Sequence, residues 1–275
     1  MVVASAISFW VALVLYCAGA CFYAYQFVLR KQSIGTYARV LVFLGFIAQT
    51  ASIGFTSIAT EGTLLTGPNV ISLASWVVIL VYCIFELIIR VKAYGAFLVP
   101  VAVILMSVGR VLTSLNFEWA NNSIVYSTPL LSFHIIVLLI GFAAFIIAGV
   151  SAGMLLYQEN LLKNHKSTQI GRRIPALATL KRVSRQSILF GFPFVTVGMF
   201  IGIIMSAGQD YPQWYFAPRI ILVALIWVVY GIYLLQIYRE SASVKSSSYI
   251  AMLGAFLTIA LLIVLGMFPM FGPTA

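Results

Sequence analysis

The sequence predicts an all-α integral membrane protein with eight transmembrane helices and both termini on the extracytoplasmic side. Of the 275 residues, 63% are apolar and only 8% are charged, whereas roughly 25% of the residues in an average soluble domain are charged. The apolar residues fall into stretches long enough to cross a bilayer, and most of the cations lie in alternate loops between them. These observations exclude a soluble globular domain, a disordered chain and a disulfide-stapled secreted scaffold.

Each span is predicted from its length and apolar content. A helix rises about 1.5 Å per residue, so about 20 apolar residues cross the hydrocarbon core. The qualifying stretches, in chain order, are 7–29, 40–60, 71–89, 97–113, 131–157, 187–207, 219–238 and 249–268. The fifth follows Pro129, and the seventh follows Pro218, a residue typical of a helix start. The spans account for most of the chain and predict one polytopic membrane domain over residues 1–275.

The orientation follows from the cations. Fourteen of the sixteen Lys and Arg residues lie in the loops after the first, third, fifth and seventh spans. Cytoplasmic loops collect Lys and Arg, so these four loops are predicted to be cytoplasmic and both termini outside. The net charge of +10 thus reflects topology, and we expect no nucleic-acid partner. The longest of these loops, about 158–186, is basic; it can attract anionic lipid or dock a cytosolic partner, and both alternatives stay open.

Few residues in the chain could perform chemistry. His134 is predicted at the outer end of the fifth span, where an ionisable residue is either a functional site or an interfacial hydrogen-bonding group. A neutral imidazole at the end of a rigid helix can bind haem iron axially. Glu86 lies four residues before Arg90, a spacing that favours a local ion pair over a proton-relay carboxylate. Three cysteines, all within apolar runs, are predicted to be small core residues.

The outer loop between the sixth and seventh spans is rich in aromatic residues. It carries Trp214, Tyr215 and Phe216 before Arg219, a cation at the positive end of a helix dipole. The aromatic residues can form an interfacial belt, and Arg110 can snorkel to the outer headgroups. Together with His134, these groups also describe a site for a planar, apolar dianion. Haem fits, since its ring stacks on aromatic side chains and its propionates pair with Arg219 and Arg110.

Several segments resemble the cytochrome c assembly proteins, the haem-handling group that includes CcsA, CcmC and HemX-like members. WYFAPRIILVALIWVVYGIYLLQIYR at 214–239 resembles the family's tryptophan-rich signature and the helix after it. FHIIVLLIGFAAFIIAGVSAGMLLYQENLLK at 133–163 resembles its histidine-led helix, and IPALATLKRVSRQSILFGFPFVTVGMFIG at 174–202 its linker and following helix. The resemblance covers about half of the chain, 131–268. Eight spans with outward termini are most similar to the HemX-like branch.

The sequence also departs from the family pattern. The signature's aspartate is Ala217, one of its tryptophans is Phe216, and a histidine of some members is Leu235. The counterpart of another family histidine is Met270. A thioether can serve as an axial ligand beside a histidine, so His134 and Met270 form a conceivable iron-binding pair.

The resemblance implies two alternative functions. The first is a membrane protein that binds b-type, non-covalent haem at its outer face and supports the assembly of cytochrome c or another haem protein. The second is a HemX-like regulatory or scaffolding protein whose basic loop acts on a tetrapyrrole-pathway enzyme or another membrane-complex partner. In either case we expect an assembly factor rather than a catalyst, located in the bacterial cytoplasmic membrane or an organellar inner or thylakoid membrane. A secondary transporter would normally carry midplane charges, which this chain almost lacks.

Overall fold

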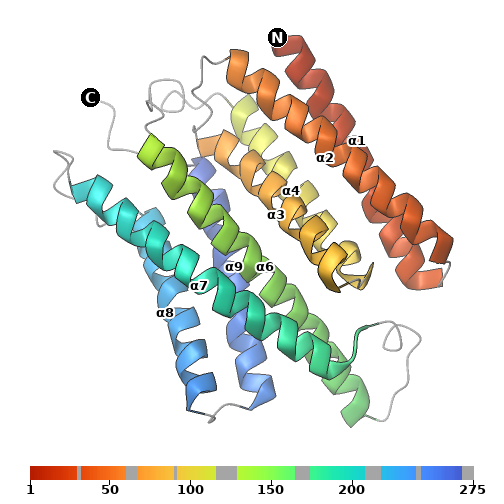
Figure 1. Ribbon diagram of the computed structural model, residues 1–275, viewed down its shortest axis with the longest axis vertical. Coiled ribbons are helices and arrows are strands. Elements are labelled where there is room, and N and C mark those ends of the chain that lie inside the picture. Colours follow the sequence, from red (N-terminus) through yellow and green to blue (C-terminus); the bar gives the residue numbers. More distant parts are fainter. Residues whose placement is uncertain are drawn as a thin grey trace. The chain divides into compact units, whose positions relative to one another are not determined.

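The computed structural model describes residues 1–29, 32–59, 67–89, 92–115, 129–164, 174–207, 218–239 and 243–267. All regular structure in these ranges is helical (Figure 1). The helices are α1 (Val2–Leu29), α2 (Gln32–Ala59), α3 (Gly67–Ile89), η1 (Lys92–Tyr94), α4 (Gly95–Ser114), α6 (Pro129–Lys163), α7 (Leu177–Ala207), α8 (Pro218–Tyr238) and α9 (Val244–Met267).

The eight predicted spans are confirmed as eight helices that are long and apolar enough to cross a membrane. Most of these helices extend past the predicted limits. α6 continues to Lys163, and α7 begins at Leu177, so both ends of the basic segment about 158–186 are helical. The apolar stretches predict only the part of each helix that lies in the hydrocarbon core. A helix satisfies its own backbone hydrogen bonds, so it can continue beyond that core into polar surroundings. The chain is a multi-pass integral membrane protein.

The described residues divide into two compact units. The first contains residues 1–132 and 262–275, and the second contains residues 133–261. In the first unit, α1 packs along α2, α3 packs along α4, and α1 also contacts α4. Two glycines allow α1 and α2 to approach closely, because a Cβ would lie 2.7 Å from Val42 Cγ2 at Gly19 and 2.8 Å from the Tyr16 ring at Gly45.

The second unit is built around α6. In the most apolar 18-residue stretch of α6, 78% of the residues are buried. This share is larger than in any other membrane-length helix that the structure describes. Phe145 of α6 stacks on Tyr230 of α8 with 3.7 Å between the ring centroids. Gly149 packs directly against Ala255 of α9. α6 therefore contacts its neighbours through small residues and flat rings, as expected where close packing rather than the hydrophobic effect holds helices together.

The prediction that all three cysteines are core residues is wrong for two of them. Cys17 and Cys21 are exposed on α1, and Cys83 is partly buried. A transmembrane helix is apolar on its lipid-facing side as well as in the core, so an apolar run alone does not show which way a small residue faces.

Candidate functional site

His134 lies in the second turn of α6 and is partly buried. Its Nδ1 lies 2.8 Å from the backbone carbonyl oxygen of Gly198 in α7. A carbonyl oxygen only accepts hydrogen bonds, so Nδ1 carries the proton and donates it. The other ring nitrogen, Nε2, then holds a lone pair that can bind a metal ion. Histidines that bind metals commonly donate their second ring N–H to a carbonyl or carboxylate in this way, which fixes the tautomer and the ring orientation.

Two glycines of α7 make room for the imidazole ring. A Cβ at Gly202 would lie 2.7 Å from His134 Cε1. One turn earlier, a Cβ at Gly198 would lie 2.5 Å from Leu138 Cδ2, so a side chain there would require the Leu138 side chain to shift. The four-residue spacing of these glycines places both on the face of α7 that meets α6. The hydrogen bond of His134 therefore depends on the absence of side chains at Gly198 and Gly202.

Of the other predicted haem contacts, the structure describes Arg219 in the second unit. Arg219 is in the first turn of α8, directly after Pro218, and is partly exposed. Trp227, two turns further along α8, donates its indole N–H to Thr196 Oγ1 of α7 at 3.0 Å. Trp214, Tyr215, Phe216 and Met270 lie outside the described residues, so the aromatic platform and the His134–Met270 pair stay predictions. Among the described residues, no three His, Cys, Asp or Glu side chains form a metal cluster.

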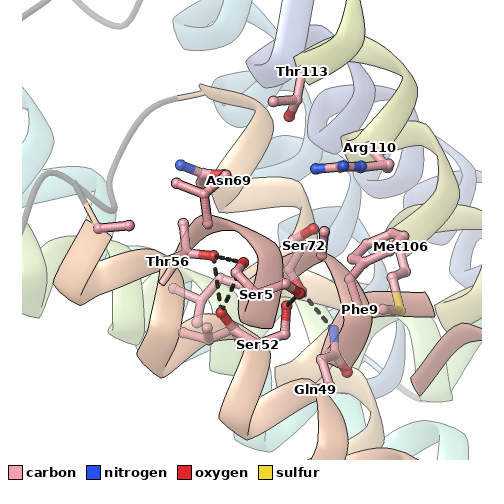
Figure 2. Close-up of a pocket in the computed structure, with 15 residues that line it drawn as sticks. Ser5, Phe9, Gln49, Ser52, Thr56, Asn69, Ser72, Met106, Arg110 and Thr113 are labelled. Carbon is pink, nitrogen blue, oxygen red and sulfur yellow. Dashed lines mark hydrogen bonds between the residues drawn. The ribbon is translucent and has the colours of Figure 1, made fainter. Parts of the chain in front are cut away.

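Arg110 belongs to the first unit, where it lines a cavity of about 310 Å³ between α1, α2, α3 and α4 (Figure 2). Its guanidinium carbon lies 5.4 Å from the centre of the Phe9 ring, within cation–π range. Arg110 is the one charged side chain among the described residues that line this cavity. The cavity therefore offers an arginine above an apolar floor that includes Met106, a suitable place for a carboxylate on an otherwise apolar molecule.

The wall of the Arg110 cavity is a network of neutral polar groups, which Figure 2 shows. Ser5 and Thr56 share a hydrogen bond of 2.6 Å, and Ser52 donates to the Ser5 carbonyl at 3.0 Å. Gln49 donates to the Ser72 carbonyl at 3.1 Å. This network was not predicted, although Gln49, Ser52 and Thr56 recur in the sequence at the spacing of one helix face in an otherwise apolar span.

Glu86 is the centre of a second polar network in the first unit, and it is only 6% exposed. Its Oε1 accepts from both Nη2 and Nε of Arg39 in α2, at 2.9 and 3.1 Å. Its Oε2 accepts from the hydroxyls of Tyr82 and Tyr23, at 2.9 and 3.2 Å. The sequence predicted Arg90 as the partner, but Arg90 lies outside the described residues, and the structure gives Glu86 a non-local partner. Arg39 was missed because it is distant in sequence.

Comparisons with known proteins agree with the resemblance in the sequence. A family model described as cytochrome C assembly protein matches residues 5–269. Protein HemX from Brevibacillus brevis is 24% identical over 126 residues, a match that covers 46% of this chain and 46% of that protein. The matched region therefore spans about half the length of this curated relative. No solved structure matches.

Proposed function

Because the chain belongs to the cytochrome c assembly protein family, we propose that it holds b-type, non-covalent haem at its outer face and so supports assembly of cytochrome c or another haem protein. Family membership supports the haem-handling role itself. The observation that carries the site is the hydrogen bond from His134 Nδ1 to the Gly198 carbonyl, because it prepares Nε2 as an iron ligand.

The residues of the second unit fit such a group. A ring nitrogen with a free lone pair suits haem iron, and Arg219 at the start of α8 suits a propionate. When bound, haem would supply its own electrophilic vinyl groups, or the redox activity that the haem protein under assembly uses. The protein's own residues would bind and orient the ring. The roles of Arg110 as a carboxylate partner and of Met270 as an iron ligand stay predictions from the sequence.

The orientation belongs to the same proposal. The cations near the end of α6 that carries Lys163 and near the start of α7 support an inner side at that end. His134 is near the opposite end of α6. The site is thus proposed at the extracytoplasmic face, with both termini on that side.

The first test is a visible spectrum with a pyridine haemochrome assay on protein purified in mild detergent from cells supplied with a haem precursor. We expect near-stoichiometric haem, and we expect His134→Ala to abolish or strongly perturb the Soret band. His165→Ala is the matched control, because it removes the other histidine of the chain. Arg219→Ala should weaken haem retention without shifting the ligand-dependent bands. Unchanged haem content and spectrum in both the His134 and Arg219 variants would overturn the outer site.

Substitutions at Gly202 and Gly231 test the orientation of the His134 ring, with His134 itself kept. Gly202→Ala places a methyl group against the His134 ring and should displace it from Gly198, changing the spectrum while leaving the protein folded. Gly231→Ala is the control, since a Cβ at Gly231 meets no atom within 4 Å. Identical spectra for the two variants would argue against this orientation of His134.

The second candidate function is a regulatory or scaffolding role, and the similarity to a protein named HemX favours it. The regulatory role requires a partner that binds the basic segment about 158–186. Binding of that partner should not depend on His134. A protein that stays colourless after haem is added back would support this role. Co-purification of a tetrapyrrole-pathway enzyme, lost when Arg172 and Arg173 are both changed to Gln, would identify the partner.

A further inference from the structure

The second unit contains a cavity that the haem proposal does not use. It has a volume of about 280 Å³ and lies where α6, α7, α8 and α9 converge at the basic end of the unit. Its polar lining comes from Lys181, Ser184 and Arg185 of α7, from Tyr233 and Gln236 of α8, and from Ser247 and Ser248 of α9. Ser184 and Ser248 are 4% and 3% exposed, so the hydroxyls lie in the wall rather than on the surface.

The charge in this cavity is one-sided. Lys181 and Arg185 are four residues apart on α7 and therefore project from the same face of that helix. No carboxylate is present among the described lining residues. Glu159, one turn from the lining residue Leu155, forms an ion pair with Lys163 at 2.6 Å. Both side chains are exposed, so an anion can reach them from solvent, and its charge would offset their mutual repulsion.

Two further features point to a ligand that carries both a negative charge and a hydroxyl group. α9 begins at this cavity, where Val244 is a lining residue and Ser243 Oγ accepts from the Ser246 N–H at 3.1 Å. The first turn of α9 has no acidic residue, so the positive end of its dipole is not neutralised there. The amide oxygen of Gln236 is buried and has no hydrogen-bond partner. A ligand that carries a hydroxyl group beside its negative charge would supply the missing donor.

The depth of the cavity suggests the source of the anion. With His134 at one membrane boundary, about 20 further residues of α6 span the hydrocarbon core and end near residue 154. Leu155 lines the cavity, which therefore lies at the level of the opposite headgroups. A lipid phosphate lies at this depth, and a soluble phosphate ester can also reach it from the water.

We propose that this cavity binds the phosphate group of a hydroxyl-bearing phosphate ester. Lys181 and Arg185 would hold the phosphate oxygens, the first turn of α9 would face them, and Gln236 would accept from the ligand's hydroxyl. The shared chemistry is a phosphate ester, from either an anionic lipid headgroup or a soluble phosphorylated molecule. The site is independent of His134 and of haem.

The test compares two double variants of the full-length protein in detergent. Lys181→Gln with Arg185→Gln removes the two cavity cations. Arg182→Gln with Arg239→Gln removes two exposed cations at the same end that do not line the cavity, so it is the matched control. Native mass spectrometry measures binding of phosphatidylglycerol and of phosphatidylcholine. A thermal-shift titration with inorganic phosphate on lipid-depleted protein measures the soluble alternative.

We expect the cavity variant to bind phosphatidylglycerol about tenfold more weakly than the wild type, and the control to stay within about twofold. Gln236→Leu, which keeps both cations, should weaken binding a few-fold. Stabilisation by inorganic phosphate, present in the wild type and control but lost in the cavity variant, would assign the site to a soluble ester. Equal lipid binding by all variants, together with equal or absent responses to phosphate, would overturn the proposal.

Discussion

At the scale of single residues, Glu86 shows how much depends on one buried carboxylate. It accepts four hydrogen bonds from three side chains, of which Tyr23 and Tyr82 are fully buried. Arg39 differs, since its side chain is 48% exposed and can turn to water if the carboxylate is lost. Removing the acceptor therefore affects the two tyrosine hydroxyls most.

This arrangement predicts an order of stability among variants. Glu86→Gln keeps an oxygen that can accept from the tyrosines, whereas Glu86→Leu removes the shared acceptor of both hydroxyls and should cost about 1–3 kcal/mol more. Glu159→Gln, which breaks the partly exposed pair with Lys163, should cost only about 0–1 kcal/mol. Thermal unfolding of the purified variants in one detergent checks this order, and equal midpoints for the two Glu86 variants would contradict it.

At the scale of elements, the packing of α6 on α7 depends on glycine. A Cβ at Gly141 would lie 2.6 Å from Val195 Cγ2 and 3.0 Å from the Gly191 carbonyl oxygen. The nearest atom to a Cβ at Gly153, further along α6, is 4.0 Å away. The same substitution therefore meets a tight contact at one position and an ordinary contact at the other.

We expect Gly141→Ala to destabilise the protein by about 1–3 kcal/mol, because the backbone carbonyl of Gly191 cannot move without moving α7. Gly153→Ala should be neutral or slightly stabilising, since alanine favours a helix. Unfolding midpoints of the two variants measure the difference. A Gly141 variant as stable as the Gly153 variant would show that α6 and α7 separate without cost.

The positions of the helices could be predicted from sequence, but their ends and their contacts could not. All eight apolar stretches are helices because the bilayer requires about the same apolar length of each. α7 begins ten residues before its predicted start at 187. Lys181 and Arg185 limit the apolar stretch from which the start was predicted, but both residues are compatible with a helix.

The candidate site divides in the same way. His134 could be found from its type and place in the chain, whereas its partner Gly198 could not, because a backbone carbonyl leaves no mark in the residue pattern. The pairing of Glu86 with Arg39 was missed for a related reason. The spacing of residues in a sequence predicts contacts within one helix only. Arg39 lies on α2 and Glu86 on α3, so spacing could not predict their ion pair.

At the scale of the whole molecule, the proposed topology predicts the location of both chain ends. A phosphatase that is active only outside the cytoplasm, fused after Ala275, should be active, and a cytoplasm-dependent fluorescent protein there should be dark. The same reporters inserted between Lys166 and Arg172 should give the opposite result. An inactive phosphatase at the C-terminus, with a fluorescent fusion there, would reverse the assignment of faces.

The unbroken length of α6 has a mechanical consequence. From His134 to Lys163 the helix contains no proline, and at about 1.5 Å per residue the two positions are about 44 Å apart. If an unbroken helix of this length tilted by about 5° around its His134 end, its Lys163 end would move by about 4 Å. Under the proposed topology, a tilt of α6 at the extracytoplasmic face would thus reach the cytoplasmic face as a displacement of the residues around Lys163.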